Sequence, residues 1–167
     1  MDVYPWVVLV HVISVILFFV AHGTSMAVAF RLRRERDPAR VRALLDLSSW
    51  TLGVPAIIAV LIGLLTGILA GFLGGWWGAG WIWTSLVIFV VVGGLMTPLV
   101  AARLNRMRAA AGTVPQPAFA ARKGAEVPAG DPAELARLLD EWNPIPAAAM
   151  GFGALLVILW LMLLKPF

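Results

Sequence analysis

The sequence predicts an all-α integral membrane protein, a four-helix bundle in a single transmembrane domain that covers residues 1–167. Two observations support this fold class. Hydrophobic residues make up 61% of the chain and charged residues only 13%, with a mean hydropathy of +0.91, whereas soluble domains average about 25% charged residues. Four apolar runs are also long enough to cross a bilayer, for which about 20 helical residues suffice.

The predicted spans cover about residues 4–30, 52–73, 81–102 and 145–164. Of the 13 Lys and Arg residues, six lie in 31–42 and six in 103–137, both between spans on the same side of the membrane. The positive-inside rule then places both stretches in the cytoplasm and both termini outside. The composition is rich in Ala, Arg and Gly, so we expect a multi-pass protein of a bacterial inner (plasma) membrane. Tryptophans gather at the predicted interfaces, as anchors do: Trp6, Trp76, Trp77, Trp81, Trp83 and Trp160 outside, Trp50 and Trp142 inside.

An internal repeat relates the two halves of the chain. The pattern A-x-R-L-x-R-x-R ends the first span at 29–36 and the third at 101–108. Each is followed by an Asp-Pro-Ala segment, at Asp37 and at Asp131, and Asp as N-cap with Pro at the first helical position typically begins a helix. These patterns predict two tandem parallel two-span repeats with short interfacial cytoplasmic helices. The predicted ranges are about 1–73 for the first repeat, 81–164 for the second, and 109–130 for a cytoplasmic loop.

The first span carries both histidines of the protein. His11 and His22 are 11 residues apart, so they share one helix face about 16 Å apart along the axis. An ionisable side chain inside a membrane is a functional-site hypothesis by default, and imidazole commonly binds haem iron, copper or zinc. The alternative is a pair of neutral histidines that hydrogen-bond a neighbouring helix. Hydroxyl partners for that reading are Thr66, Thr84, Ser85 and Thr97.

Two further patterns bear on ligands. Met26 lies one turn after His22, and an imidazole with a thioether suits Cu(I), so copper is an alternative cofactor with His11, His22 and Met26 as metal ligands. The second span carries small residues at every fourth position, which let helices approach closely, or let a helix approach a flat ligand such as a porphyrin. This ladder consists of Ala59, Gly63, Gly67 and Gly71.

Several functions lack the residues they need. The predicted spans contain no Asp, Glu, Lys or Arg, so they lack the residues from which an acidic proton relay is built. The chain has no cysteine, which excludes disulfides and thiolate metal sites. No catalytic constellation is present and no catalytic residue is assigned. Membrane orientation accounts for most basic residues, so nucleic acid is not expected as a partner, although the 31–42 cluster also suits anionic lipid headgroups.

The opening pattern, an apolar span with an early histidine in Leu9-Val10-His11-Val12-Ile13 and small residues before a basic exit, resembles the first helix of three groups of small multi-span proteins. These are the CopD-like copper-resistance proteins, the HemJ-type protoporphyrinogen oxidases and a set of uncharacterised predicted integral membrane proteins. The resemblance covers the first span. It implies a four-helix bundle in which His11 ligates haem or a metal, and it gives no role to His22.

Three hypotheses for function result. The first is a redox-linked protein that binds haem b through His11 and His22. The second is a non-catalytic structural subunit of a larger membrane complex, and the third is copper handling. The bilayer is the expected partner, with a homodimer and a larger complex as alternatives, and enzyme activity stays open. We favour a bound haem or metal because burying two imidazoles costs free energy.

Overall fold

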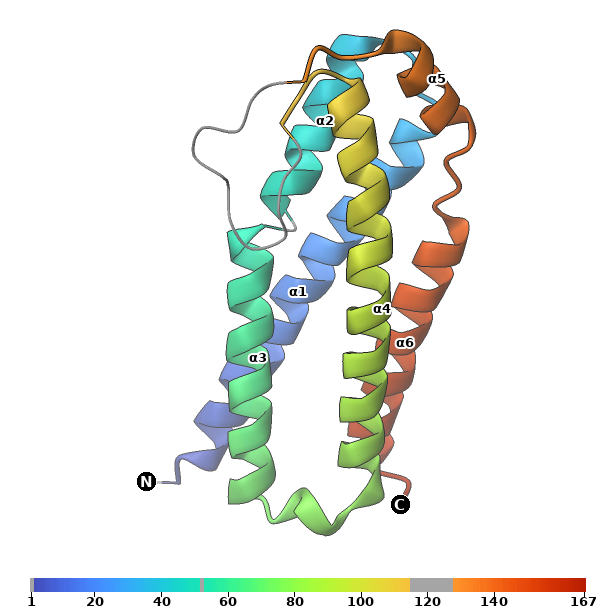
Figure 1. The fold of residues 1–167 in the computed structure, drawn as a ribbon. Coiled ribbons are helices and arrows are strands. Elements are labelled where there is room, and N and C mark those ends of the chain that lie inside the picture. Colours follow the sequence, from blue (N-terminus) through green and yellow to red (C-terminus); the bar gives the residue numbers. More distant parts are fainter. Residues whose placement is uncertain (1, 52, 115–127) are drawn as a thin grey trace.

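The computed structural model describes residues 2–51, 53–114 and 128–167. These residues contain helices and no strand, as predicted, and four helical stretches are long and apolar enough to cross a membrane. The elements in chain order are α1 (Tyr4–Leu32), α2 (Pro38–Thr51), α3 (Val54–Leu73), a 3₁₀ turn η1 (Trp76–Gly78), α4 (Gly80–Ala110), α5 (Pro132–Asp140) and α6 (Ile145–Leu164). Both chain ends lie at the end of the bundle opposite α2 and α5 (Figure 1).

The helix bounds match the predicted spans for α1, α3 and α6 to within two residues. Helix α4 differs, because it continues through Pro98 to Ala110, beyond the predicted end at residue 102. A proline removes one backbone hydrogen bond, and long membrane helices tolerate that loss. The first part of the predicted cytoplasmic loop 109–130 therefore belongs to α4, and residues 115–127 lie outside the described residues.

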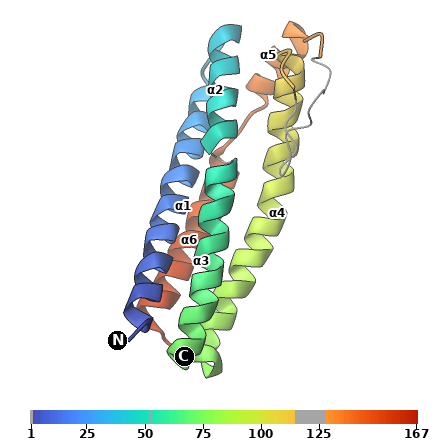
Figure 2. The same ribbon diagram turned by 90° about the vertical axis from the view of Figure 1, so that its left-hand side faces the viewer.

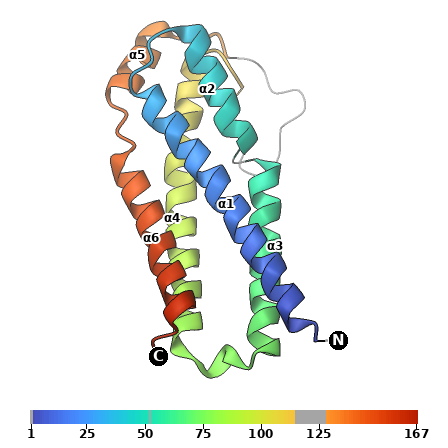
Figure 3. The same cartoon turned by 180° about the vertical axis from the view of Figure 1, so that it is seen from behind.

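Helix α2 corrects a prediction. The Asp-Pro-Ala segment was expected to begin a short helix lying flat at the membrane interface, but α2 runs beside the C-terminal part of α1 and leads into α3 (Figures 2 and 3). Its buried residues include Val41 and Leu45, which face α1 and α4 in one apolar cluster. The same cluster contains Leu104 and Met107 of α4, so the apolar face of α2 packs inside the protein.

The helix order long, short, long occurs twice, as α1–α2–α3 and as α4–α5–α6. Helix α1 packs mainly against α3, and α4 packs mainly against α6. Asp131 begins α5 as predicted, since its carboxylate accepts the backbone N–H groups of Ala133 and Glu134 at 3.0 and 3.1 Å. The tandem relation of the two halves stays a prediction.

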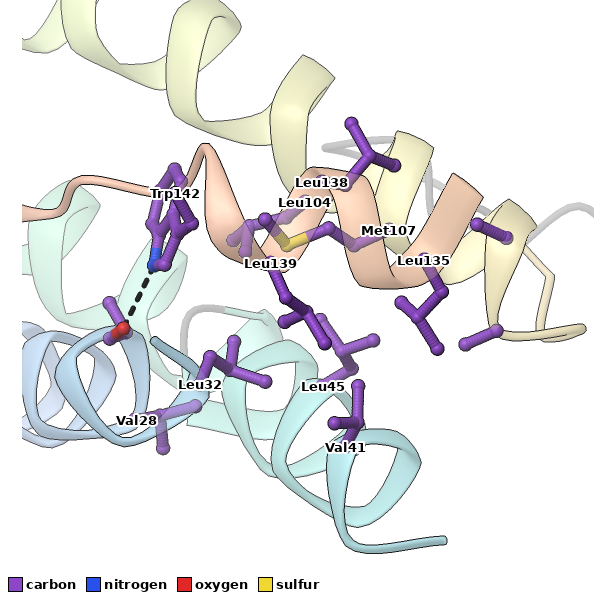
Figure 4. Close-up of a cluster of buried hydrophobic side chains, with 13 residues drawn as sticks. Val28, Leu32, Val41, Leu45, Leu104, Met107, Leu135, Leu138, Leu139 and Trp142 are labelled. Atoms are coloured by element: carbon purple, nitrogen blue, oxygen red, sulfur yellow. Dashed lines mark hydrogen bonds between the residues drawn. The ribbon is translucent and has the colours of Figure 1, made fainter. Parts of the chain in front are cut away.

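A cluster of thirteen buried residues, which we name the cap core, joins the two halves at the end that holds α2 and α5 (Figure 4). Side chains also link the helices there by hydrogen bonds. Trp142 Nε1 donates to Ala29 O at 2.8 Å, and Arg42 Nε donates to Ala111 O at 2.7 Å. The cap core consists of Val28, Ala29, Leu32, Val41, Leu45, Leu104, Met107, Ala110, Ala111, Leu135, Leu138, Leu139 and Trp142.

Six of the eight tryptophans are either clearly exposed or buried, while Trp76 and Trp77 are half-buried. Trp6, Trp50, Trp83 and Trp160 are exposed on the helix bundle, as lipid-interface anchors are. Trp142 and Trp81 were predicted as anchors too, but their exposed fractions are only 4% and 7%. The prediction for Trp142 is wrong because its indole N–H satisfies a carbonyl in the last turn of α1, which has no partner within the helix.

Candidate functional site

The remaining part of the bundle, which we name the spanning section, comprises α3, α6 and the parts of α1 and α4 beside them. The small-residue ladder of α3 faces α1 there. A Cβ added at Gly63 would lie 3.5 Å from Ser14 Cβ, and one added at Gly67 would lie 2.9 Å from His11 Cε1. The small-residue ladder therefore lets α1 and α3 pack closely, which is the first of the two roles predicted from its spacing.

His11 sits at the centre of this contact. Its Nδ1 atom lies 2.8 Å from the backbone oxygen of Gly63, and because a carbonyl oxygen only accepts, Nδ1 must carry the proton. In the neutral form of the ring, Nε2 carries the lone pair. The ring is half-buried and lies against Gly67, where a side chain would collide with it. Gly63 and Gly67 together fix both the tautomer and the position of this imidazole.

The described hydroxyls expected as partners are bonded to main-chain oxygens and not to His11, although Thr66 Oγ1 also lies 3.2 Å from Gly63 O, which His11 contacts. Thr66 Oγ1 donates to Ile62 O at 2.6 Å, and Thr84 and Ser85 donate to the backbone of their own helix four residues earlier. Residue 97 lies in a part of α4 whose side chain is outside the description. His11 does hydrogen-bond the neighbouring helix, as the alternative interpretation held, but its partner is the main-chain oxygen of Gly63 and not a hydroxyl.

His22 faces a different helix. Its ring lies between Phe18, at 5.9 Å between ring centroids, and Phe152 of α6, at 5.1 Å. A Cβ added at Gly151 would lie 2.7 Å from His22 Nε2, which is buried and has no hydrogen-bond partner in the described part of the chain. His22 therefore fills the α1–α6 contact, where a glycine makes room for it.

The structure does not bring the candidate ligands together. His11 contacts α3 and His22 contacts α6, while Met26, one turn beyond His22, is buried with 5% of its surface exposed. Within the described residues, no group of three or more His, Cys, Asp or Glu could hold a metal ion. One chain therefore offers at most isolated imidazoles.

The two histidines differ in whether they fit a haem or metal. His11 fits, because its Nδ1–H is donated to a backbone carbonyl, and metal-ligating histidines almost always have such a partner on the second nitrogen. His22 does not fit in this arrangement, since its Nε2 lies against Gly151 and leaves no room for a ligand between them.

Sequence reasoning missed the carbonyl of Gly63 and the ring of Phe152, which both contact the histidines. The spacing of the α3 ladder was the available signal for Gly63, because a ladder of small residues exposes backbone oxygens to the neighbouring helix. No comparable spacing pointed to Phe152.

Fold and site together define a helical integral membrane protein with four candidate spans and a histidine held at a helix–helix contact. Residues 5–166 match the model of the family described as "Predicted integral membrane protein (DUF2269)", and the chain belongs to that family. The match supports the third group named from the sequence, and not the CopD-like or HemJ-type groups. No curated protein and no solved structure matches the chain.

Proposed function

We propose that this protein binds haem b through His11 and takes part in electron transfer at a bacterial inner membrane, with both termini outside. The observation that carries the proposal is the 2.8 Å hydrogen bond between His11 Nδ1 and Gly63 O. This bond leaves Nε2 as the free lone-pair nitrogen, and it orients the ring as backbone partners orient metal-ligating histidines. A bound haem iron supplies one-electron chemistry.

The protein residues contribute position and tautomer. The Gly63 carbonyl holds the proton on Nδ1, and Gly67 leaves space for the ring beside α3. The ring as a whole is only half-buried, on the α1–α3 pair. A further ligand to the iron would come from water, from another side chain or from a second copy of the chain.

The test is a dithionite-reduced minus oxidised absorption spectrum of the detergent-purified protein, with iron and copper analysis of the same sample. We expect a b-type α-band that is lost in His11→Ala. His22→Ala is the matched control, because it removes an imidazole from the same helix and should keep the band. A colourless, metal-free protein from haem-replete cells would contradict the proposal, as would a band lost only in His22→Ala. Copper in place of iron would point to copper handling.

The second candidate is a structural subunit of a larger membrane complex. Gly93 and Gly94 of α4 favour it, because both are exposed and a Cβ added at either would meet no described atom within 4 Å. Exposed glycines let another membrane helix approach closely. A complex isolated in a mild detergent that shrinks in Gly94→Leu, while the haem spectrum is absent, would favour this candidate over the first.

A further inference from the structure

A hollow of about 710 Å³ lies where α1 ends and α6 begins. It is lined by Ala27, Phe30, Arg31, Arg33, Arg34 and Ile145. We propose that this hollow is a binding site for an anionic phospholipid, with the phosphate at the arginines and an acyl chain along the apolar residues. The proposal concerns a different site from the histidines and does not depend on a bound haem.

The charged end of the hollow contains guanidinium groups that no described carboxylate pairs with. Arg33 and Arg34 form no ion pair with any described residue, whereas Arg31 lies 3.5 Å from the carboxylate of Glu35. A guanidinium presents several N–H donors in a planar fork that matches the oxygens of a phosphate. Two unpaired guanidinium groups on one rim are therefore suited to hold a single phosphate.

The negative charge of Glu35, which lies beside Arg31, is shared with other donors. The Glu35 carboxylate accepts the backbone N–H groups of Arg36 and Asp37 at 3.1 and 3.2 Å. The carbonyls at the C-terminus of α1, which carry the negative end of the helix dipole, are also engaged. Arg33 O accepts from Arg36 Nη1 at 3.0 Å, and Ala29 O accepts from Trp142. An anion at the rim thus meets little repulsion.

The other end of the hollow is apolar and continues along α1. Ala27 and Phe30 line it, and Gly23, one turn before Ala27, would meet no described atom within 4 Å of an added Cβ. Residues three and four apart share a helix face, so Gly23, Ala27 and Phe30 form one strip of α1, and Arg33 and Arg34 follow just after its end. The strip runs from the guanidinium groups toward the spanning section, which is the course that an acyl chain takes from its headgroup.

The combination of both ends points to a lipid and not to free phosphate. A soluble phosphate would use the arginines alone and leave the apolar surface of Phe30 and Ile145 exposed. The hollow also lies at the basic exit of a candidate span, at the level where lipid headgroups meet a helix.

The experiment is native mass spectrometry of the full chain in detergent, titrated with phosphatidylglycerol and, separately, with phosphatidylcholine. We expect preferential binding of one phosphatidylglycerol. In the double variant Arg33→Gln/Arg34→Gln its affinity should fall about 30-fold, since each arginine near a charged lipid contributes roughly a factor of five. The matched control is Arg103→Gln/Arg106→Gln, which removes the same charge from the corresponding exit of α4 and should change the affinity less than about threefold.

A second variant tests the apolar end. Ala27→Phe fills the hollow and leaves all charges in place, and because Ala27 is exposed the helix should fold as before. We expect it to weaken phosphatidylglycerol binding as well. Equal losses in both double variants, or none in either, would overturn the proposal, because attraction would then be general. Displacement of the lipid by soluble glycerophosphate at equal concentration would overturn the lipid assignment in favour of a phosphate site.

Discussion

The cap core and the spanning section differ in the size of the side chains they bury. Leucine, methionine, valine and tryptophan make up most of the cap core. Many of the buried residues of the spanning section are small, among them Ser14, Ala59, Gly63 and Gly151, while its large apolar residues are mostly exposed.

The surroundings explain this difference. At the polar end of the bundle, large apolar side chains gain free energy by leaving water. Inside a bilayer, lipid tails are as apolar as leucine, so that gain is missing and helices associate through close backbone contact. The His11–Gly63 hydrogen bond is such a contact. The cap core should therefore supply most of the stability, and the spanning section should supply close packing.

The largest expected effect tests the source of stability. Leu45→Ala in the cap core removes a side chain with 0% exposure and should lower the free energy of unfolding by about 2–5 kcal/mol. Leu65→Ala is the matched change in the spanning section, where Leu65 is 65% exposed, and should have an effect below about 0.5 kcal/mol. Unfolding by SDS, followed by circular dichroism, measures both. Equal losses of unfolding free energy in the two variants would show that the cap core does not supply more stability than the spanning section.

A smaller effect tests close packing. In Gly151→Ala the new Cβ would lie 2.7 Å from His22 Nε2, so we expect a loss of about 1–3 kcal/mol from overpacking. Gly153→Ala is the control, since a Cβ there meets no described atom within 4 Å, and better helix propensity should stabilise it by up to about 1 kcal/mol.

The combined variant Gly151→Ala/His22→Ala tests whether a collision with the His22 ring causes the loss of stability. If the collision with the imidazole causes the loss, removing the ring should restore much of the stability, and the two changes will not be additive. Additive losses would show that the packing of Gly151 does not depend on His22.

The sequence predicted the spans well because bilayer thickness sets the length of an apolar helix. It did not predict the partners of the side chains. The spacing of Gly63 and Gly67 marked a packing face, and His11 marked a polar position, but their pairing depends on how α1 and α3 are rotated against each other. The periodic pattern of one helix does not show how that helix is rotated against the next.

Helix α2 and Trp142 illustrate the same limit. The apolar face of α2 suits either a membrane surface or a protein core, and the length of α4 beyond Pro98 decided in favour of the core. A tryptophan near a span end is a good lipid anchor in general. Trp142 instead satisfies a helix-end carbonyl, which composition and position did not reveal.

The last prediction separates the two regions by pH. The backbone N–H groups of Asp37 and Arg36 lower the pKa of Glu35 below its ordinary value of 4.5, and the Arg137 guanidinium lowers the pKa of Glu134. A depressed pKa means that the folded state favours the ionised carboxylate, so its contribution is complete above the ordinary pKa and is lost as pH falls through the lower, folded value. Acid should therefore destabilise the cap end.

The spanning helices should respond differently, because α1, α3, α4 and α6 contain no Asp or Glu. Between pH 5 and about pH 3, in the range where carboxylates with depressed pKa values become protonated, protection against hydrogen exchange, relative to the intrinsic exchange rate at each pH, should fall in α2 and α5 and persist in α3 and α6. Glu35→Gln should flatten part of this pH dependence, since an amide does not titrate. A uniform loss of protection along the chain would show that both regions unfold as one cooperative unit, and the contrast between cap core and spanning section would then hold for packing alone.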